Sequence, residues 1–555
     1  MKSITKDKLY TSSLLSVLFL LAATITILAS VPPISRDALT HHLAIPKLYL
    51  KHGGIYEIPD RPFSYYPMNL DLLYLFPLSF GNDIIPNLIH FSFALMTAWL
   101  IYNYLKKRTD SIHGLIGALF FLSIPVIVKL SITAYVDLGL IFFSTAALLF
   151  LFRWRETSKK NWLILSAVMC GLAMGIKYNG LISFMLLMSF VPIIYLGKTR
   201  KRLFDQCKSL GYGLLFSLIA IIIFSPWMVR NYIWTKNPVY PLFSDRFQSS
   251  RVTDSDTDPK NIKEKSPSNL APFAIRKVVY QESWWKIALV PIRIFFEGQD
   301  DNPKLFDGKL NPFLCLLPLL ALLFRSGNDG FPKTEKKILA LFSVLFLFIS
   351  FFLADMRIRY IGPILPPLVI LSMIGLFQIK KVLSEHVYKQ NKGVISILVF
   401  LSLVFLFLIN FLYIAKQLGH LEPIPYITGS INRNEYIEKY WPEYAAIRYL
   451  NENISTDSKI LALFIGDRGY YFEREIFFGK NELQKNINKS ESPRSILMFF
   501  KRFDISYILV REDLFINWIQ TSFNDEAKTN FLVLFQHHLK PVFSKAGFKI
   551  FQVAI

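Results

Sequence analysis

Long apolar blocks alternate with short polar segments along the chain. A helix needs about 20 predominantly apolar residues to cross a bilayer, and we predict eleven such helices, some shortened by proline or flanked by aromatic residues. The first block is long for the core of a signal peptide and lacks an A-x-A cleavage site, so we expect it to be a retained span. The blocks lie near residues 10–31, 84–105, 113–130, 134–152, 161–176, 178–197, 209–229, 310–324, 338–354, 361–379 and 393–415.

Two segments between the blocks are long enough to hold structure of their own. Segment 32–83 is rich in Pro, Tyr and His, and we expect helices at 38–51 and 68–80 that lie at the membrane surface. Segment 230–309 has a polar middle that is typical of a flexible loop. The run at 283–296 mixes tryptophan and basic residues with aliphatic ones, which predicts an interfacial helix.

The composition becomes more polar after the last block. Strands that alternate with helices are typical of a small α/β domain. We predict strands at 459–465, 505–510 and 548–554, and helices at 435–453, 493–502 and 525–538. The predicted organisation is a mainly α, polytopic membrane domain, 1–415, with outer loops 32–83 and 230–309, and an extracytoplasmic α/β domain, 416–555.

The interpretation of the net charge depends on where the charged residues lie along the chain. The chain of 555 residues carries a formal charge of +22, and in a soluble protein this excess would indicate nucleic acid. Here the N-terminal tail and every second short loop hold 23 basic and 7 acidic residues, an excess on one side of the membrane that the positive-inside rule assigns to the cytoplasm. We therefore expect a multi-pass protein of the cytoplasmic (inner) membrane, with a cytoplasmic N-terminus and a periplasmic 416–555, and no nucleic-acid partner. The three cysteines, at 170, 207 and 315, do not indicate a disulfide framework.

Two carboxylates are predicted at the outer boundary of the membrane. Asp37 follows the first span, and if 38–51 is helical it shares a face with His41 at i, i+4. Asp137 begins the fourth span. Ionisable groups near a membrane are costly and usually functional. The alternative is structural, because a carboxylate also caps the start of a helix and complements its dipole.

Cations are predicted at the same outer level, where the positive-inside rule disfavours them. A set of them on a charge-poor face indicates an anionic ligand such as a phosphate, which takes several charge-assisted donors. Snorkelling of each side chain to the interface is the alternative. The cations are Lys177, Arg230, Arg357 and Arg359, with Trp227, Tyr178 and Tyr360 as candidate rim residues of a groove.

A metal site is a further candidate in the first outer segment. Asp60 could bind a divalent metal ion together with His41, His42 or His52, since Zn²⁺ accepts such ligands and Mg²⁺ or Mn²⁺ prefers carboxylates. No H-x-E or H-E-x-x-H spacing supports this hypothesis. A nucleotide-binding P-loop, G-x-G-x-x-G and G-x-S-x-G are also absent from the sequence.

With these motifs in order, the sequence resembles the GT-C membrane glycosyltransferases, in particular the bacterial protein-mannosyltransferase-like enzymes and the aminoarabinose transferase of lipid A. The matching features are an outer loop that opens with Ser35-Arg36-Asp37, Tyr135-Val136-Asp137 at the fourth span, GxKYxG at 175–180, PWxxRN…NPxYP at 226–241 and RYxxPxLPxL at 359–368. Two departures stand out. Ala38 follows Asp37 where family members often have Glu, and Asp60-Arg61-Pro62 stands in place of the Glu-Lys-Pro whose Glu binds a metal in the aminoarabinose transferase.

The resemblance implies hexosyl or pentosyl transfer from a polyprenyl-phosphate donor to a glycan, lipid or protein acceptor, with inversion in one displacement. Asp37 and Asp137 would be the catalytic residues, and the four outer cations would bind the donor phosphate. A polytopic transporter or flippase for a lipid or lipid-linked sugar is the main alternative, and a non-catalytic assembly protein is another. The substrate groove would be lined by His41, His42, Tyr65, Tyr66, Tyr178, Trp227 and Tyr360.

Overall fold

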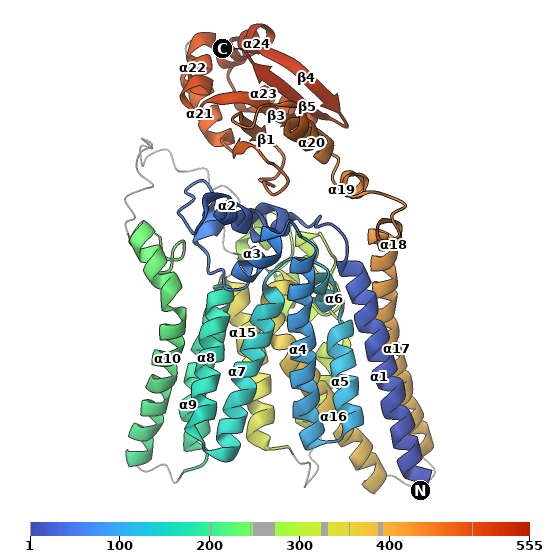
Figure 1. The fold of residues 1–555 in the computed structure, drawn as a ribbon. Coiled ribbons are helices and arrows are strands. Elements are labelled where there is room, and N and C mark those ends of the chain that lie inside the picture. The colour runs from blue at the N-terminus through green and yellow to red at the C-terminus, as the bar shows by residue number, and fades with distance from the viewer. Residues whose placement is uncertain are drawn as a thin grey trace. The chain divides into compact units, whose positions relative to one another are not determined.

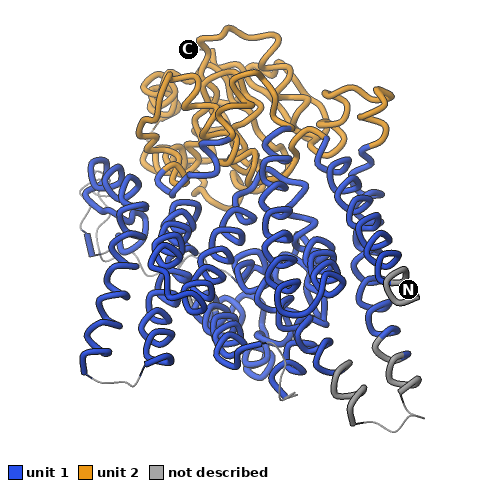
Figure 2. Tube along the Cα trace, turned by 60° about the horizontal axis from the view of Figure 1, so that its bottom comes forward, with its two compact units in different colours: residues 1–30, 65–73, 85–423 blue, residues 31–64, 74–84, 424–555 orange. Residues whose placement is uncertain are grey.

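The computed structural model describes residues 2–199, 203–244, 246–247, 272–323, 331–353, 356–386, 392–490 and 492–554. The chain folds into two compact units, coloured separately in Figure 2. Unit 1 comprises residues 1–30, 65–73 and 85–423, and unit 2 comprises residues 31–64, 74–84 and 424–555. The first outer segment is therefore divided between the units, and much of it belongs with the C-terminal residues. The polar middle of the second outer segment, 249–269, lies outside the described residues.

Unit 1 is a set of apolar helices that run side by side (Figure 1). Each of the eleven predicted blocks contains a helix, which confirms a polytopic, mainly helical membrane protein. The helices are α1 (Lys2–Ala29), α4 (Ile85–Arg108), α5 (Ser111–Ser123), α6 (Pro125–Ser131), α7 (Asp137–Thr157), α8 (Lys160–Ile176), α9 (Gly180–Leu196), α10 (Leu203–Thr235), α14 (Phe313–Leu323), α15 (Lys333–Leu353), α16 (Leu365–His386) and α17 (Lys392–Leu421).

The number of spans stays a prediction. In the described part of the chain, six helices are long and apolar enough to cross a membrane, or seven when α5 and α6 count as one bent span. These two helices meet at 66°, because Ile124 adopts an extended conformation before Pro125, as residues preceding proline usually do. Helices α8, α9 and α14 are apolar but shorter.

Short helices lie between the long helices of unit 1. They are α11 (Pro272–Val278), α12 (Trp284–Ala288), α13 (Val290–Arg293), and the 3-10 turns η4 (Pro303–Leu305) and η5 (Ile358–Ile364). The continuous interfacial helix predicted at 283–296 is wrong, since α12 and α13 are separate. Leu289 leaves the helical region there, and Pro291 cannot donate a backbone hydrogen bond to continue α12.

Unit 2 contains one five-stranded mixed sheet in the order β2-β1-β3-β5-β4. Strand β1 is parallel to β2 and β3, whereas β5 is antiparallel to β3 and β4. Helices flank this sheet, so the predicted α/β character is confirmed. The elements are α18 (Pro423–Ile427), α19 (Arg433–Tyr440), α20 (Tyr444–Asn453), β1 (Lys459–Leu463), β2 (Glu475–Phe477), α21 (Lys480–Lys489), α22 (Pro493–Arg502), β3 (Ile505–Arg511), α23 (Glu512–Ser522), α24 (Asp525–His538), β4 (Leu539–Lys545) and β5 (Phe548–Val553).

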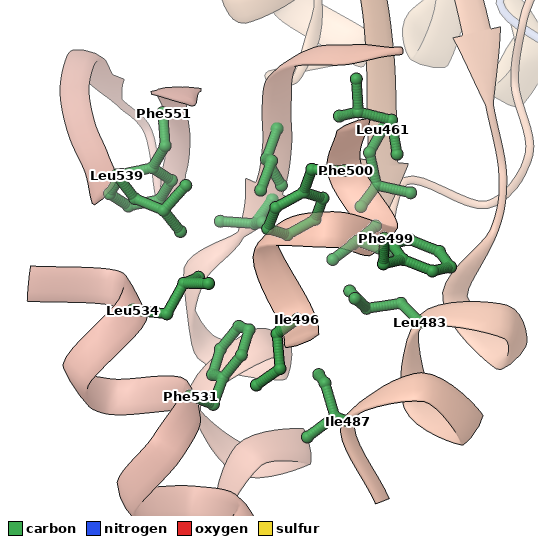
Figure 3. Packing of buried hydrophobic residues seen from close by; sticks show 14 of the residues in the cluster. Leu461, Leu483, Ile487, Ile496, Phe499, Phe500, Phe531, Leu534, Leu539 and Phe551 are labelled. Atoms are coloured by element: carbon green, nitrogen blue, oxygen red, sulfur yellow. The ribbon is translucent and has the colours of Figure 1, made fainter. Parts of the chain in front are cut away.

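Apolar cores cover both faces of the sheet, which suits a domain without disulfides. Along β1, Leu461 packs into one core and Ile460 into the other, because successive side chains of a strand point to opposite faces. The first core is closed by α21, α22 and α24, which contribute Leu483, Phe500 and Phe531 (Figure 3). Helix α20 lies against the second core.

The first outer segment also forms the predicted helices, with altered bounds. A π-helical turn, η1 (Ala38–His42), is followed by α2 (Ala44–His52), the 3-10 turn η2 (Pro62–Tyr65) and α3 (Asp71–Ser79). The regular helix predicted over 38–51 is therefore wrong in its first turn. The helix predicted over 435–453 is also wrong as a single element, because α19 ends where Trp441 precedes Pro442.

Candidate functional site

A buried ion pair lies at the beginning of α7 in unit 1. Asp137 is only 1% exposed, and the Lys177 ammonium group donates a hydrogen bond of 2.9 Å to its Oδ1. The second carboxylate oxygen, Oδ2, is buried and has no hydrogen-bond partner among the described residues. A buried acceptor is costly when it is left unpaired. The carboxylate therefore retains the capacity to accept a further hydrogen bond.

Glycines on either side of Lys177 allow the chain to pack this closely. A Cβ atom on Gly175 would lie 2.0 Å from the Asn69 side-chain nitrogen, and one on Gly180 would lie 2.4 Å from the Ala173 carbonyl oxygen. The backbone N–H of Asn69 donates to the Gly175 carbonyl at 2.9 Å. The GxKYxG sequence is thus a tight turn between α8 and α9 that brings segment 65–73 beside Lys177.

His90 fixes the turn that carries Asp137. Its Nε2 accepts a 2.9 Å hydrogen bond from the Leu138 amide, so this nitrogen carries no proton. Its Nδ1 lies 2.9 Å from the Leu130 carbonyl oxygen and 2.8 Å from that of Thr133, which assigns the ring proton to Nδ1. The neutral imidazole therefore joins α4 to the chain between α6 and α7. Sequence reasoning overlooked His90 because its partners are backbone atoms.

A second cation acts electrostatically on the same carboxylate. Arg359, in η5, is 9% exposed, and its guanidinium lies 5.2 Å from the rings of both Tyr135 and Tyr360. The Lys177 ammonium is 4.4 Å from the Tyr360 ring. Both cations interact electrostatically with Asp137. Two of the four predicted phosphate-binding cations are thus brought together around Tyr360 and Asp137.

Arg230 lies in an adjoining polar and aromatic cluster and acts as a tether. One of its terminal nitrogens donates to the carbonyls of Tyr65 at 2.7 Å and Tyr66 at 3.1 Å, and the guanidinium lies 4.5 Å from the Trp227 ring. Asn231 donates to the Tyr65 carbonyl as well, at 2.9 Å. These bonds join α10 to the chain entering α3. Such partners are backbone carbonyls, which no residue pattern reveals.

The predicted aromatic residues of unit 1 contact one another around this tether. The Tyr66 and Tyr178 rings are 5.4 Å apart, and the Tyr178 hydroxyl donates to the Tyr240 carbonyl at 2.7 Å. The Trp227 indole donates to the Asn69 side-chain oxygen at 2.8 Å. The Tyr65 ring lies 4.9 Å from that of Tyr240.

Arg357 has a different environment from the other three cations. Its guanidinium is 3.5 Å from the Asp307 carboxylate. The Lys129 ammonium also approaches this acidic loop, at 3.1 Å from Asp301 and 3.5 Å from Asp300. Arg357 is therefore paired with a carboxylate of this acidic loop, and its role at the donor phosphate stays a prediction.

The remaining predicted site residues belong to unit 2. Asp37 occupies the N-cap position of η1, but within the described residues its side chain makes no capping hydrogen bond. Its backbone is helical rather than extended, so the capping interpretation is wrong. The His41 ring lies 4.0 Å from that of His42 and 4.3 Å from Phe63. The closeness of these residues to Asp137 stays a prediction.

The surroundings of Asp60 do not fit a metal ion. In the described ranges, no three His, Cys, Asp or Glu side chains form a group that could hold one. The charged neighbour of Asp60 is instead Arg61, whose guanidinium is 3.8 Å away. We therefore derive no chemical step through a metal.

The structure adds a carboxyl group that the sequence did not single out. Asp71 is the first residue of α3 and only 2% exposed. Burial raises the pKa of this carboxyl well above its usual range, and Lys177 and Asp137 act on it with opposite signs. Asp71 lies two residues after Asn69, and Lys177 lies two residues after Gly175, the residue whose carbonyl accepts from the Asn69 backbone. The signal in the sequence was an acidic residue inside the apolar run 68–80.

Comparisons with known proteins support the fold independently. The family model for dolichyl-phosphate-mannose-protein mannosyltransferase matches residues 74–229. The structure of ArnT from Cupriavidus metallidurans in the apo state has a TM-score of 0.59 and 12% sequence identity, covering 99% of this chain and 98% of that chain. The same protein bound to undecaprenyl phosphate gives a TM-score of 0.54 at 12% identity, covering 97% of each chain. No curated protein matches the sequence.

A more distant structure has a related fold. The apo oligosaccharyltransferase of Archaeoglobus fulgidus has a TM-score of 0.50 and 11% identity, covering 95% of this chain and 73% of that chain. The resemblance to GT-C glycosyltransferases inferred from the sequence motifs is thereby confirmed, as is the GT-C-like fold of a multi-pass membrane protein.

Proposed function

We propose that the protein is an integral membrane glycosyltransferase that moves a sugar from a polyprenyl-phosphate donor to an acceptor at the outer face of the cytoplasmic membrane. The observation that carries this proposal is the convergence of Lys177 and Arg359 on Tyr360 beside the buried Asp137. The family match and the likeness to a structure bound to undecaprenyl phosphate support the same chemistry.

The cations would act on the leaving group. When the bond from the sugar to the phosphate breaks, negative charge develops on the phosphate oxygens, and fixed cations in a water-poor site stabilise it. Lys177 supplies a compact charge and Arg359 a planar set of donors. Arg230, held by the Tyr65 and Tyr66 carbonyls, keeps the neighbouring segment in place.

The acceptor needs a general base that removes the proton from its attacking group. Asp37 would take the proton from the attacking hydroxyl or amine, while Asp137 orients Lys177. The sugar, a hexose or pentose, would be transferred with inversion in a single displacement. The acceptor would be a glycan, lipid or protein that is exposed outside the cytoplasm. The enzyme itself would have its N-terminus in the cytoplasm and its C-terminal domain in the periplasm.

The test is direct transfer by the purified protein in lipid nanodiscs. A panel of polyprenyl-phosphate sugars and surface-glycan or protein acceptors is incubated with the enzyme, and released polyprenyl phosphate is measured with the glycosylated product. We expect transfer by the wild type and large losses for Lys177→Gln and Arg359→Gln. Lys286→Gln, which removes an exposed cation from α12, is the matched control. Movement of a lipid-linked sugar across the bilayer without transfer would support the transporter alternative instead.

A further inference from the structure

The C-terminal part of unit 2 holds the short helix that follows Asp37. The Tyr470 amide donates to the Leu39 carbonyl at 3.1 Å, which ties the loop after β1 directly to η1. Leu39 itself is buried. A π-helical turn is rare and appears frequently at functional sites, and here it is stabilised by a residue more than 400 positions further along the sequence, beyond the spans.

Lys47 on α2 makes the most extensive of these contacts. Its ammonium donates to the carbonyls of Tyr470 at 2.8 Å and Phe472 at 3.1 Å, and to the Glu473 carboxylate at 2.8 Å. Three donors and three acceptors are thereby satisfied at one point. Lys51, one turn later, has only a 3.5 Å contact with the Glu473 carbonyl. The two lysines therefore offer a matched pair on one helix.

Two further hydrogen bonds hold the chain before Asp37. The Trp441 indole donates to the Ile34 carbonyl and the Tyr471 hydroxyl to the Pro33 carbonyl, each at 2.6 Å. The indole also lies under the Arg468 guanidinium, at 3.2 Å from the ring centre. Asp37 is thus held on both sides, by bonds to 33–34 and to 39–47.

We propose that the clamp, defined as Trp441 together with residues 470–473, positions Asp37 for proton transfer and is the contribution of the C-terminal domain to catalysis. The inference rests on the proposed function. The candidate phosphate-binding cations lie in unit 1. Loosening the clamp should therefore misplace the base without weakening the binding of the donor phosphate. A displacement of about 1 Å in a catalytic group can cost on the order of a hundredfold in rate.

The test compares kcat and donor KM for single substitutions in the full-length protein in nanodiscs. Lys47→Met removes the three donors and Tyr471→Phe removes one hydroxyl. We expect each to lower kcat, by roughly ten- to a hundredfold for Lys47→Met, while donor KM stays the same. Lys47→Arg restores charged donors and should recover part of the rate. The controls are Lys51→Met and Tyr444→Phe, and both should behave as wild type. The Tyr444 hydroxyl donates to Asn434 within the same domain.

Hydrogen–deuterium exchange of residues 35–43 gives a readout that does not depend on activity. We expect faster exchange in Lys47→Met than in Lys51→Met. Equal exchange in the two variants, or an equal fall in kcat and in donor affinity, would overturn the positioning role. Absence of transfer by the wild type with every donor would overturn the proposed function instead, and the exchange experiment would still decide whether the clamp exists.

Discussion

Asp37 is the residue to which we assign the role of general base. Because asparagine has nearly the same shape as aspartate, replacing the carboxylate with an amide should not disturb the start of η1. We expect Asp37→Asn to insert and fold normally and to transfer sugar about 10²–10⁴-fold more slowly, the usual contribution of a general base. The measurement is kcat with a polyprenyl-phosphate sugar, and Glu452→Gln, an exposed carboxylate of α20, is the control.

Asp137→Asn extends the same comparison. Its carboxylate already accepts from Lys177, so its removal should change donor KM and lower kcat less than Asp37→Asn does. A near-normal rate for Asp37→Asn, combined with a large loss for Asp137→Asn, would transfer the role of base to Asp137 and its unpaired oxygen.

Asp71 gives a pH dependence with a definite sign. Burial raises the pKa of its carboxyl in the folded protein. The folded state therefore holds the proton to a higher pH than the unfolded state does, and this contribution to stability is present at low pH and lost as the pH rises toward the raised pKa. Asp71→Asn stays neutral at every pH. We expect its apparent melting temperature, relative to wild type, to increase from pH 5 to pH 8.

The control for Asp71 is an acidic residue in the same position of another helix. Asp525 also begins its helix, α24, but its side chain is exposed. Asp525→Asn should show no such pH-dependent difference. A constant difference between Asp71→Asn and wild type across the pH range would mean that Asp71 is ionised in the folded protein.

At the scale of helices and strands, the sequence predicted elements best where one simple pattern dominates. The apolar blocks and the strands of β1, β3 and β5 were found because each is a continuous apolar or alternating run. Strand β2 has only three residues, and β4 contains Pro541 and lies at the sheet edge, where proline is tolerated. Neither has a pattern that stands out from a loop.

The residues of the candidate site were likewise predictable only where their side chains leave a pattern in the sequence. Lys177 and Arg359 were predicted together because cations are unusual at the outer end of a span. The tethering role of Arg230 and the tautomer of His90 depend on backbone carbonyls and amides, which carry no side-chain signature. The π-helical turn at 38–42 was also unpredictable, since its anchor Tyr470 lies far away in the sequence.

The whole molecule raises the question of which face of the membrane carries the chemistry. The orientation rests on loops rich in Lys and Arg, and a transferase that uses an externally exposed acceptor requires the C-terminal domain to lie outside. Unit 2 joins segment 31–64 with 424–555. Both of these parts must therefore be on the same side, so a single labelled position in the sheet domain reports on the Asp37 segment too.

A cysteine at position 457 tests this orientation. Asp457 is exposed in the turn before β1, so Asp457→Cys should react with a membrane-impermeant thiol reagent in intact cells. The native Cys207 is also exposed, but it lies near the beginning of α10, at the end of this helix that is predicted to be cytoplasmic, and it should react only after lysis. With Cys315 replaced by serine and Cys170 buried, the two sites are read separately by peptide mass spectrometry. The reverse labelling order would place Asp37 in the cytoplasm and refute transfer at the outer face, whatever the arrangement of Lys177 and Arg359.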